Sequence, residues 1–382
     1  MDDTEDLNRL IRELNTGVRG DAGADAARLT HWLRALAERG GSDLLLVAGA
    51  PPAVRVDGAV LALSEGPLSG EEIAEAVLPA LNAALRSRFQ QGEIADGSYK
   101  VAGLGRFRIN LHRERGRAAA AVRALPSRPP RLGSLGLPPG TEALTRLPRG
   151  LVLVGGPTGS GKTTTLAALV EEINLRDARH IVTIEDPIEY EHQNLRSVIE
   201  QVEIGTDAPD FPTALRSALR QAPDVIVIGE MRDTETMNIA LAAGETGHLV
   251  FSTLHTSDLA TTVARIADSF SSERQPTIRQ ELAMALTAVF TQMLLPTTTG
   301  ERVPAAELLM LSYGARQHIR KNGVQHLHQE IALTRKLGSF SLEESLARLV
   351  KRGVVPKGEA QLRANHPEEF EHLLATLPSS VS

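Results

Sequence analysis

The segment GGPTGSGKTTTLAALV, residues 155–170, carries glycines, a lysine and hydroxyl side chains in an order that suits phosphate binding. It satisfies the pattern G-x-x-x-x-G-K-[ST] at Gly156, Gly161, Lys162 and Thr163, directly after the apolar run GLVLVGG. Glycines let backbone N–H groups converge on an anion, and the amino end of the following helix adds partial positive charge. Lys162 can reach the β and γ phosphates, and the Thr163 hydroxyl can ligate Mg²⁺. The sequence therefore predicts a nucleotide phosphate site, whose other expected members are Thr158, Gly159, Ser160 and Thr164.

Carboxylates follow two further strand-like segments. QAPDVIVIGEMRD ends in Glu230, where a P-loop fold places a carboxylate that organises Mg²⁺ through water. IVTIEDPIEYEH runs into Glu185, Asp186 and Glu189, and Pro187 turns these residues into a loop at the strand end. Hydrolysis needs a group that positions water near the γ-phosphate, and any of these three carboxylates is chemically eligible. Their spacing alone does not choose among them, and a solvated acidic loop is the alternative.

Two histidines flank a third strand in GETGHLVFSTLHTSD. His248 precedes the strand, and His255 follows it with Thr253 and Thr256 close by in sequence. A histidine at a strand end is more often a hydrogen-bonded structural residue than a catalytic one. The same cluster also suits a polar sensor of the γ-phosphate, so both interpretations stay open.

These residues need an α/β scaffold, and the order of elements predicts one. Residues 26–39 predict an amphipathic helix with Leu29, Trp32, Leu33 and Leu36 on its apolar face, so residues 1–39 are expected to be an N-terminal extension. Short strands at 42–49, 52–58 and 59–64, a helix at 69–89, and strands at 103–115 and 117–127 predict a small α+β domain over residues 40–125.

The rest of the chain predicts a linker and a larger domain. Six prolines interrupt residues 126–150, which are therefore expected to be an interdomain linker with at most one short helix. Residues 151–382 alternate apolar strands with helical patterns, as in a parallel α/β sheet, and end in a helical region. In that region, 341–352 predicts a helix with Leu342, Leu346, Leu349 and Val350 on one face after a Ser341–Glu344 capping box.

Composition excludes several classes of function. The 382 residues contain no cysteine, which excludes disulfides and thiolate metal sites and fits a reducing cytoplasm. The 41 basic and 47 acidic residues give a net charge of −6, so no general attraction to nucleic acid is expected. The acidic start MDDTEDLNRL does not resemble a secretory signal, and no apolar run approaches the roughly 20 residues that span a bilayer. Direct membrane insertion is therefore not expected.

The motifs resemble those of a known family. GPTGSGKTTT, IEDPIEY, VIGEMRD and TGHLVFSTLHT, in this order and spacing, are similar to the Walker A, Asp-box, Walker B and His-box motifs of the type II/IV secretion and type IV pilus ATPases. The likeness continues through SDLLLVAGAPPAVRVDG and covers most of residues 40–355. It implies a RecA-like P-loop ATPase domain preceded by a small PAS-like α+β domain. It also implies a homohexamer in which ATP and Mg²⁺ bind between the domains and hydrolysis moves one subunit against the next.

The resemblance assigns roles by position. Glu189 falls on the family's catalytic glutamate, which favours it over Glu185 and Asp186. Lys162 and Thr163 bind phosphates and Mg²⁺, and Glu230 is the Walker B glutamate. His255 lies near the γ-phosphate, supported by His248. Arg108 and Arg123 fall on arginines that reach the nucleotide from the N-terminal domain, although the residues alone fit two exposed strand arginines equally well.

Within the family, the sequence resembles the pilus retraction ATPases of the PilT/PilU type. The chain has no tetracysteine zinc module, and GARQHIRKNG, residues 314–323, keeps the spacing of a retraction motif at Ala315, Arg316, Ile319 and Arg320. Gln317 and His318 depart from it.

This likeness implies a motor that removes pilin at an inner-membrane platform protein, on the cytoplasmic face of that membrane, and so drives twitching motility. The alternatives are an accessory or regulatory nucleotide-binding paralogue and a secretion or assembly ATPase. A nucleic-acid translocase is disfavoured by the net charge.

Overall fold

The computed structural model describes residues 26–378, which pack into two units. Of these residues, the N-terminal unit comprises 26–128 together with the segments Glu185–Gln193 and Val202–Asp210. The C-terminal unit comprises Pro129–Ile184, Asn194–Gln201 and residues 211–378. The motif loop around Glu189 therefore packs with the N-terminal unit, although the strand before it belongs to the sheet of the C-terminal unit.

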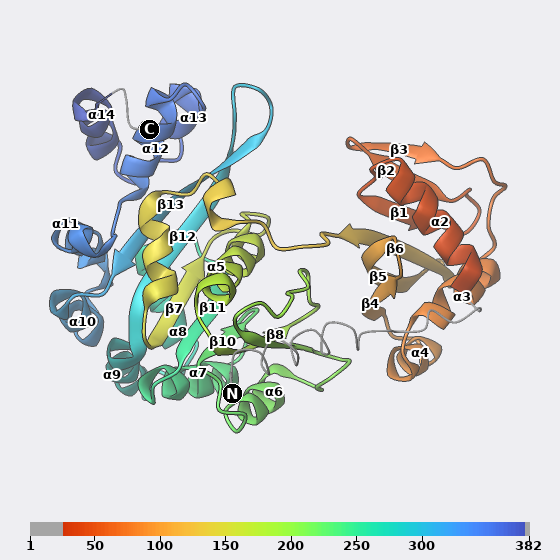
Figure 1. Ribbon diagram of the computed structural model, residues 1–382, viewed down its shortest axis with the longest axis horizontal. Helices are drawn as coiled ribbons and strands as arrows, with labels where there is room; N and C mark the ends of the chain where they lie inside the picture. Colours follow the sequence, from red (N-terminus) through yellow and green to blue (C-terminus); the bar gives the residue numbers. More distant parts are fainter. Residues whose placement is uncertain (1–25, 379–382) are drawn as a thin grey trace, which may run out of the picture. The chain divides into compact units, whose positions relative to one another are not determined.

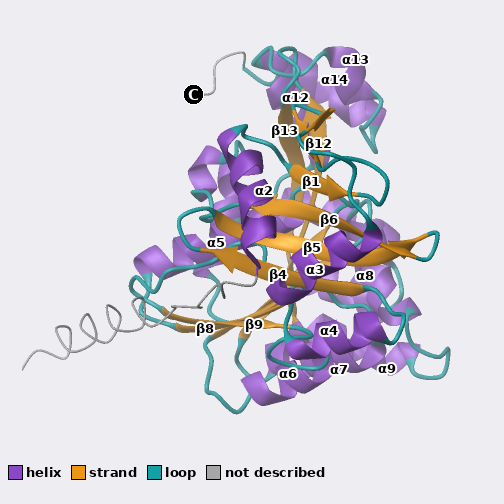
Figure 2. Cartoon of the chain, turned by 90° about the vertical axis from the view of Figure 1, so that its right-hand side faces the viewer, coloured by secondary structure: helices purple, strands orange, loops and turns teal. Residues whose placement is uncertain are grey.

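The N-terminal unit is built on a six-stranded antiparallel sheet in the order β3-β2-β1-β6-β5-β4. Its strands are β1 (Asp43–Leu46), β2 (Ala53–Val56), β3 (Ala59–Ala62), β4 (Ala95–Val101), β5 (Gly105–Glu114) and β6 (Arg117–Leu125). Helices α2 (Ala27–Glu38) and α3 (Gly70–Val77) cross one face of this sheet, as Figure 2 shows. The expected small α+β domain is therefore present.

The amphipathic helix expected near the amino end is confirmed as α2. Its four predicted apolar side chains, Leu29, Trp32, Leu33 and Leu36, are all fully buried. They share one core with the sheet and α3, so α2 is part of the domain and not of a separate extension over residues 1–39. Residues 1–25 of that expected extension lie outside the described residues.

The prediction of a single helix over residues 69–89 is wrong. The structure has α3, a 3₁₀ turn at Leu78–Ala80, and α4 (Ala83–Gln90). Pro79 lacks the N–H that would continue α3, and the Asn82 side chain accepts a hydrogen bond from the Leu85 N–H at 2.9 Å, which starts a new helix. Strand β4 was not predicted, because its sequence ADGSYKV contains glycine, serine and two charged residues instead of an apolar alternation.

The C-terminal unit is built on a seven-stranded sheet in the order β13-β12-β7-β11-β10-β8-β9. Strands β12, β7, β11, β10 and β8 run parallel, and β13 is antiparallel to β12. The strands are β7 (Gly150–Gly155), β8 (His180–Glu185), β9 (Val198–Glu203), β10 (Val225–Ile228), β11 (Leu249–Leu254), β12 (Leu286–Pro296) and β13 (Arg302–Met310). The predicted parallel strands are confirmed, and the carboxyl ends of β7, β8, β10 and β11 meet at one edge, where the polar motifs follow.

Helices cover this sheet, as Figure 1 shows. They are α5 (Lys162–Arg176), α6 (Phe211–Ala218), α7 (Thr234–Glu245), α8 (Leu259–Asp268) and α9 (Gln275–Ala285).

The segment 126–150, expected to be an interdomain linker, is a linker only in part, because from Pro129 onward the chain packs on this unit. It forms 3₁₀ segments at Leu132–Ser134 and Pro139–Arg146, and the Arg176 guanidinium donates to the Thr145 carbonyl at 2.7 Å.

Further helices follow β13 in the chain. They are α10 (Tyr313–Arg320), α11 (Leu327–Thr334), α12 (Leu342–Lys351), α13 (Lys357–Gln361) and α14 (Pro367–Thr376), and α11 and α12 lie beside β13 in Figure 1. Helix α12 confirms the prediction for residues 341–352 and buries Leu342, Leu346 and Leu349. Only half of the expected capping box forms, because the Glu344 carboxylate pairs with Arg335 and Arg348 instead of the backbone.

Glu307 on β13 is a carboxyl group inside this unit. It is 3% exposed, and its Oε1 accepts from the Leu259 N–H at 3.1 Å and the Thr291 hydroxyl at 2.8 Å. Burial raises the pKa of Glu307 from 4.5 to about 7, and the charge of Glu343 adds to this shift, while the bond from Thr291 opposes it. Between these two pKa values the folded protein binds one more proton than the unfolded chain, so stability falls as the pH rises through 7.

The variant Glu307→Gln is expected to remove this pH dependence. A glutamine keeps the Oε1 acceptor for both donors and carries no charge. The wild type should lose up to about 3 kcal/mol of stability relative to the variant between pH 5 and pH 8. Urea unfolding midpoints of both proteins in metal-free buffer across this range measure the difference. Parallel pH profiles would show that Glu307 is ionised throughout.

Candidate nucleotide site

The phosphate loop lies between β7 and α5, as the motif predicts. Gly156 has φ 152°, and a Cβ there would lie 2.4 Å from the Ser160 hydroxyl and 2.5 Å from the Gln292 carbonyl. Gly161 has φ 88° at the start of α5, a region that L side chains avoid. Both glycines are therefore required by the backbone path of the loop.

Lys162 is the first residue of α5 and points back into the loop. Its side chain is buried, and its Nζ donates to the carbonyls of Gly156 at 2.8 Å and Pro157 at 3.0 Å. Burial lowers the pKa of Lys162, and the nearby Glu230 carboxylate opposes that shift. The buried Ser160 hydroxyl in the same loop has no hydrogen-bond partner among the described residues. A phosphate would give both the ammonium and the loop an anionic partner.

Gln292 braces the loop from β12, which sequence reasoning missed. Its Nε2 donates to the Ser160 carbonyl at 2.6 Å, and its Oε1 accepts from the Thr165 hydroxyl at 2.7 Å. Gln292 is 4% exposed, so these bonds fix the loop against the first turn of α5. The signal was present in the sequence, because Thr291 and Gln292 are polar residues in the middle of an apolar strand.

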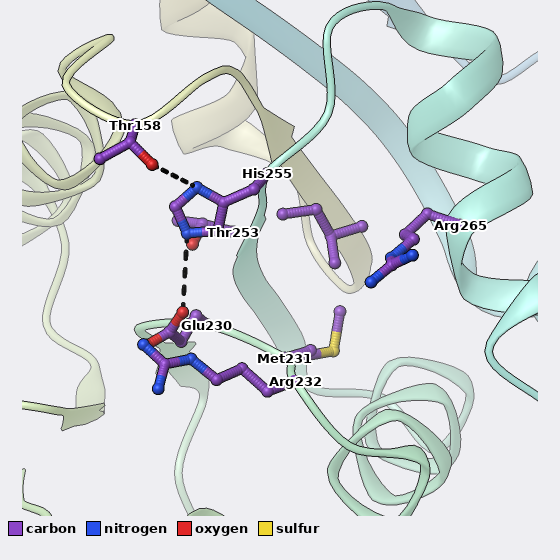
Figure 3. Close-up of a pocket in the computed structure, with 8 residues that line it drawn as sticks. Thr158, Glu230, Met231, Arg232, Thr253, His255 and Arg265 are labelled. Carbon is purple, nitrogen blue, oxygen red and sulfur yellow. Dashed lines mark hydrogen bonds and ion pairs between the residues drawn. The ribbon is translucent and has the colours of Figure 1, made fainter.

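A cavity of about 270 Å³ opens beside this loop, at the carboxyl ends of β10 and β11 (Figure 3). His255 lies at its centre, with Nδ1 3.3 Å from the Thr158 hydroxyl and Nε2 3.6 Å from a Glu230 carboxylate oxygen. The structure thus brings together one residue from each of the Walker A, Walker B and His-box motifs. The lining residues are Thr158, Glu230, Met231, Arg232, Thr253, Leu254, His255 and Arg265.

Two arginines of this cavity were not singled out from the sequence. Arg232 lies in the loop after β10 and pairs with Glu230 at 2.5 Å, and Arg265 reaches the cavity from α8. The Thr253 hydroxyl donates to the Gly229 carbonyl at 2.5 Å and fixes the backbone just before Glu230. The guanidinium groups of Arg232 and Arg265 suit a polyanionic ligand.

His248 does not join this site, which corrects the expectation that it supports nucleotide binding. Strand β11 pairs with β7 from Leu249 opposite Gly150 to Leu254 opposite Gly155. Because the phosphate loop follows Gly155, His248 lies at the far end of the strand. Its Nδ1 lies 3.1 Å from the Ala243 carbonyl in the last turn of α7, which is a structural role.

The chemistry of the phosphate loop fits Mg²⁺ bound with nucleotide. Mg²⁺ prefers oxygen ligands, usually one or two protein groups together with waters and phosphate oxygens. Thr163 offers a hydroxyl in the first turn of α5, and Glu230 offers a carboxylate that is 15% exposed. Bound Mg²⁺ neutralises phosphate charge, and the residues that would hold it here are Thr163 directly and Glu230 through water.

The N-terminal unit carries a second group of candidate residues. Glu189 lies in the loop after β8, and burial raises its pKa, with the charge of Glu185 adding to the shift. The charges of Arg108 and Arg123 act in the opposite direction and lower it. A half-buried carboxylate with a raised pKa near arginines is typical of a general base.

Arg108 and Arg123 lie directly opposite each other on β5 and β6. Arg108 makes two hydrogen bonds to Asp96, at 3.0 and 2.7 Å, and Arg123 makes one to Asp43 at 2.9 Å. Both guanidinium groups are substantially exposed, so these surface pairs are weak and can open for a stronger anion. The structure therefore places both arginines on one face of the sheet and within the electrostatic reach of Glu189.

Arg106, which sequence reasoning missed, holds the Glu189 loop. Its guanidinium donates to the Ile188 carbonyl at 2.7 Å, to the Ser98 hydroxyl at 2.7 Å and to the Glu203 carboxylate. Glu203 also accepts from the Ile188 N–H at 3.1 Å. The alternation GRFRIN puts Arg106 and Arg108 on the same face, so nothing in the sequence distinguished the buried anchor from the exposed arginine.

Alanine variants of these two arginines are expected to differ sharply. Arg106→Ala leaves the buried Glu203 carboxylate without its cationic partner and should cost about 3–5 kcal/mol of stability. Arg108→Ala removes a surface pair and should leave the melting temperature nearly unchanged while lowering ATP turnover. Calorimetry and ATPase assays of both variants test this. Equal melting temperatures, or full turnover in Arg108→Ala, would contradict the two roles.

Residues 314–323 form α10 and the turn that follows it. Ala315 and Ile319 are buried, and Arg316 donates to the Met284 carbonyl at 3.1 Å near the end of α9. His318, which departs from the expected motif, lies 3.5 Å from the Glu330 carboxylate. The segment is thus a packed helix. His318, at the position that departs from the motif, contacts the Glu330 carboxylate.

Comparisons with known proteins agree with this geometry. The model of the family described as type II/IV secretion system protein matches residues 121–368. The type IV pilus retractation ATPase PilT of Pseudomonas aeruginosa is 40% identical over 90% of this chain and 99% of its own length. The type IV pilus ATPase PilU of the same organism is 36% identical over 90% of each chain.

Solved structures show the same fold. The crystal structure of the pilus retraction motor PilT with bound ADP superposes with a TM-score of 0.82 at 40% identity, covering 90% of this chain and 98% of that one. The Legionella pneumophila ATPase DotB gives a TM-score of 0.77 at 28% identity over 87% and 94% of the two chains.

Between residues 26 and 378, no helix combines the length and apolar character needed to cross a bilayer. The chain therefore belongs to the type II/IV secretion system family and is a P-loop ATPase of the PilT/PilU-like group, with a RecA-like domain preceded by a small α+β domain.

Proposed function

We propose that this protein is a hexameric motor that couples Mg·ATP hydrolysis to type IV pilus retraction. The observation that carries the proposal is the complete set of motif residues in a chain that matches PilT over nearly its whole length. Lys162, Glu189 and Glu230 are all present, which favours turnover over simple nucleotide binding. Retraction by such a motor disassembles the filament into pilin subunits and drives twitching motility.

The C-terminal unit supplies the side chains that we propose to contact the phosphates and Mg²⁺. Lys162 leaves its loop carbonyls for the β and γ phosphates, while Thr163 and Glu230 hold Mg²⁺. His255, linked to both Thr158 and Glu230, reports the presence of the γ-phosphate by exchanging one of these partners for it. The loop members Gly159 and Thr164 complete the cradle.

The N-terminal unit supplies the water-positioning group and positive charge. Glu189 polarises the attacking water, and Arg108 and Arg123 neutralise charge that develops on the phosphates. We propose that this unit of one subunit moves against its neighbour during turnover. This movement then couples the position of Arg108 and Arg123 to the state of the nucleotide.

The partner of this motor is an inner-membrane platform protein, which the ring engages from the cytoplasmic side. Nucleic acid is not a partner, in keeping with a net charge of −6. The protein reaches the membrane through that platform.

Deletion and complementation in the bacterium that encodes the protein test the proposal. A strain without the gene should accumulate surface pili and lose twitching, and the wild-type gene should restore both. A Lys162→Ala gene should restore neither. Loss of surface pili after deletion would instead indicate an assembly ATPase, and an unchanged pilus with lost secretion would indicate a secretion ATPase.

An accessory role is the second candidate, because PilU matches the chain over the same span at 36% identity. Under that alternative, deletion would weaken retraction only under load, or Lys162→Ala would complement fully. Either outcome would contradict the role of main motor.

A further inference from the structure

Three side chains from separate helices converge at the C-terminal end of the chain, far in sequence from every ATPase motif. His328 comes from α11, Glu343 from α12 and Glu369 from α14. One nitrogen or oxygen atom from each lies within 4.8 Å of the other two. One imidazole and two carboxylates form a donor set that metalloproteins use.

The Glu343 carboxylate has an incomplete set of hydrogen bonds. It is 0% exposed, and its Oε1 accepts from the His366 N–H at 2.9 Å. Its Oε2 is buried and has no hydrogen-bond partner among residues 26–378. A buried carboxylate oxygen without a partner is costly, and one common explanation is an ion at that position. One carboxylate oxygen of Glu343 lies close enough to His328 and Glu369 for the three side chains to share a ligand.

The other two side chains are already oriented toward each other. His328 Nε2 lies 2.7 Å from Glu369 Oε2, and the Ser341 hydroxyl donates to Glu369 Oε1 at 3.0 Å. The His366 ring stacks on His328 with centroids 4.0 Å apart. Outer contacts of this kind fix the orientation of metal-binding side chains.

We propose that His328, Glu343 and Glu369 bind one divalent transition-metal ion of the Zn²⁺ class. The mixed nitrogen and oxygen set favours such an ion over Mg²⁺ and Ca²⁺, which prefer oxygen ligands alone. Ligands about 2.0–2.2 Å from a tetrahedral zinc ion lie about 3.4 Å apart. Side-chain rotations complete the site when they move His328 Nε2 and Glu369 Oε2, now 2.7 Å apart, slightly away from each other and bring the Glu343 oxygen, at most 4.8 Å from them, closer. The ion takes the place of the proton shared by His328 and Glu369, and water fills the fourth position.

Such an ion would fasten α11 to a small core that α12 and α14 share. That core includes Leu346 of α12 and Phe370 of α14. Because the unfolded chain does not hold the three ligands together, binding stabilises the folded state. The alternative is a metal-free cluster held by the hydrogen bond between His328 and Glu369.

Metal titration of the untagged full-length protein, without nucleotide, separates these two cases. Protein stripped with a chelator is titrated with Zn²⁺ by calorimetry, and bound metal is counted by mass spectrometry after desalting. The wild type should retain one zinc ion per chain and melt at a higher temperature with zinc than without it. Failure to retain zinc would overturn the proposal and leave the metal-free cluster.

Matched variants test the named ligands. Glu343→Gln should weaken zinc binding by at least about a hundredfold, because changes even to outer contacts of a metal site cost about tenfold to a hundredfold. The controls are Glu368→Gln and His372→Gln, which change the same residue types at exposed positions of α14 and should bind zinc as the wild type does. Equal zinc affinity in Glu343→Gln and the controls would refute the site.

A spectroscopic variant keeps the test decisive if Glu343→Gln does not fold. Co²⁺ bound with an imidazole ligand in a tetrahedral site absorbs visible light, and this absorption should appear in the wild type and vanish in His328→Gln. An unchanged Co²⁺ spectrum in a folded His328→Gln protein would overturn the assignment of His328. Neither measurement depends on ATP turnover, so the result stands apart from the proposed motor function.

Discussion

Replacing Lys162 with alanine is expected to lower kcat for ATP hydrolysis by at least about a hundredfold. Lys162 is the buried cation of the phosphate loop, and its ammonium is held on loop carbonyls that a phosphate can replace. Removing one preorganised group that stabilises transition-state charge costs about 10²–10³ in rate. Phosphate release by the purified full-length variant measures the effect, and a fluorescent nucleotide reports the accompanying loss of affinity.

Lys357→Ala is the control for this variant. Lys357 forms a surface pair with Glu371 and is about half exposed, so its loss should leave turnover unchanged. Substantial turnover in folded Lys162→Ala would place the phosphates somewhere other than this loop.

Glu189→Gln is expected to lower kcat about 10²–10³-fold while nucleotide affinity stays within about threefold of the wild type. A group that positions water acts chiefly in the transition state, so its loss appears in turnover and not in ground-state binding. Glu185→Gln and Asp186→Asn are the matched controls, since they change neighbouring carboxylates of the same loop and should keep most activity. If Glu189→Gln turned over at the wild-type rate and one control did not, the catalytic carboxylate would be that neighbour.

The pH dependence of turnover checks the same assignment. Burial and the charge of Glu185 raise the pKa of Glu189, and the carboxylate must be ionised to polarise water. Turnover should therefore fall as the pH drops through a value above the ordinary glutamate range. Arg108→Ala removes a charge that lowers this pKa, so its acidic limb should move to higher pH. An acidic limb that does not move would separate Arg108 from Glu189.

The strongest sequence predictions were those in which pattern and packing coincide. Strands β7, β10 and β11 are continuous apolar runs because they are buried on both faces, and α2 shows its apolar face at helical spacing. Strand β4 escaped prediction because its stability comes from pairing along β5 and not from apolar side chains. The break between α3 and α4 was missed because a single proline and an N-cap outweigh an otherwise helical pattern.

Site residues were predictable where a motif fixes them locally. The phosphate loop and Glu230 follow from motif spacing, whereas the role of His255 comes from the family resemblance. The structure brings Thr158, Glu230 and His255 to one cavity. Gln292 and Arg106 act through tertiary contacts with segments more than 80 residues away in sequence, so only the fold reveals them. The same reason hides the cluster of His328, Glu343 and Glu369, whose members come from three helices.

The most direct test of the central claim is ATP hydrolysis measured across size-separated fractions of the full-length protein in Mg·ATP, with the mass of each fraction determined by light scattering. The account predicts that turnover coincides with a hexamer, that smaller species hydrolyse little ATP, and that Lys162→Ala is inactive in every fraction. Equal turnover per subunit in monomeric fractions would contradict a ring motor, and nucleotide binding without hydrolysis in the hexamer would contradict the motor function itself.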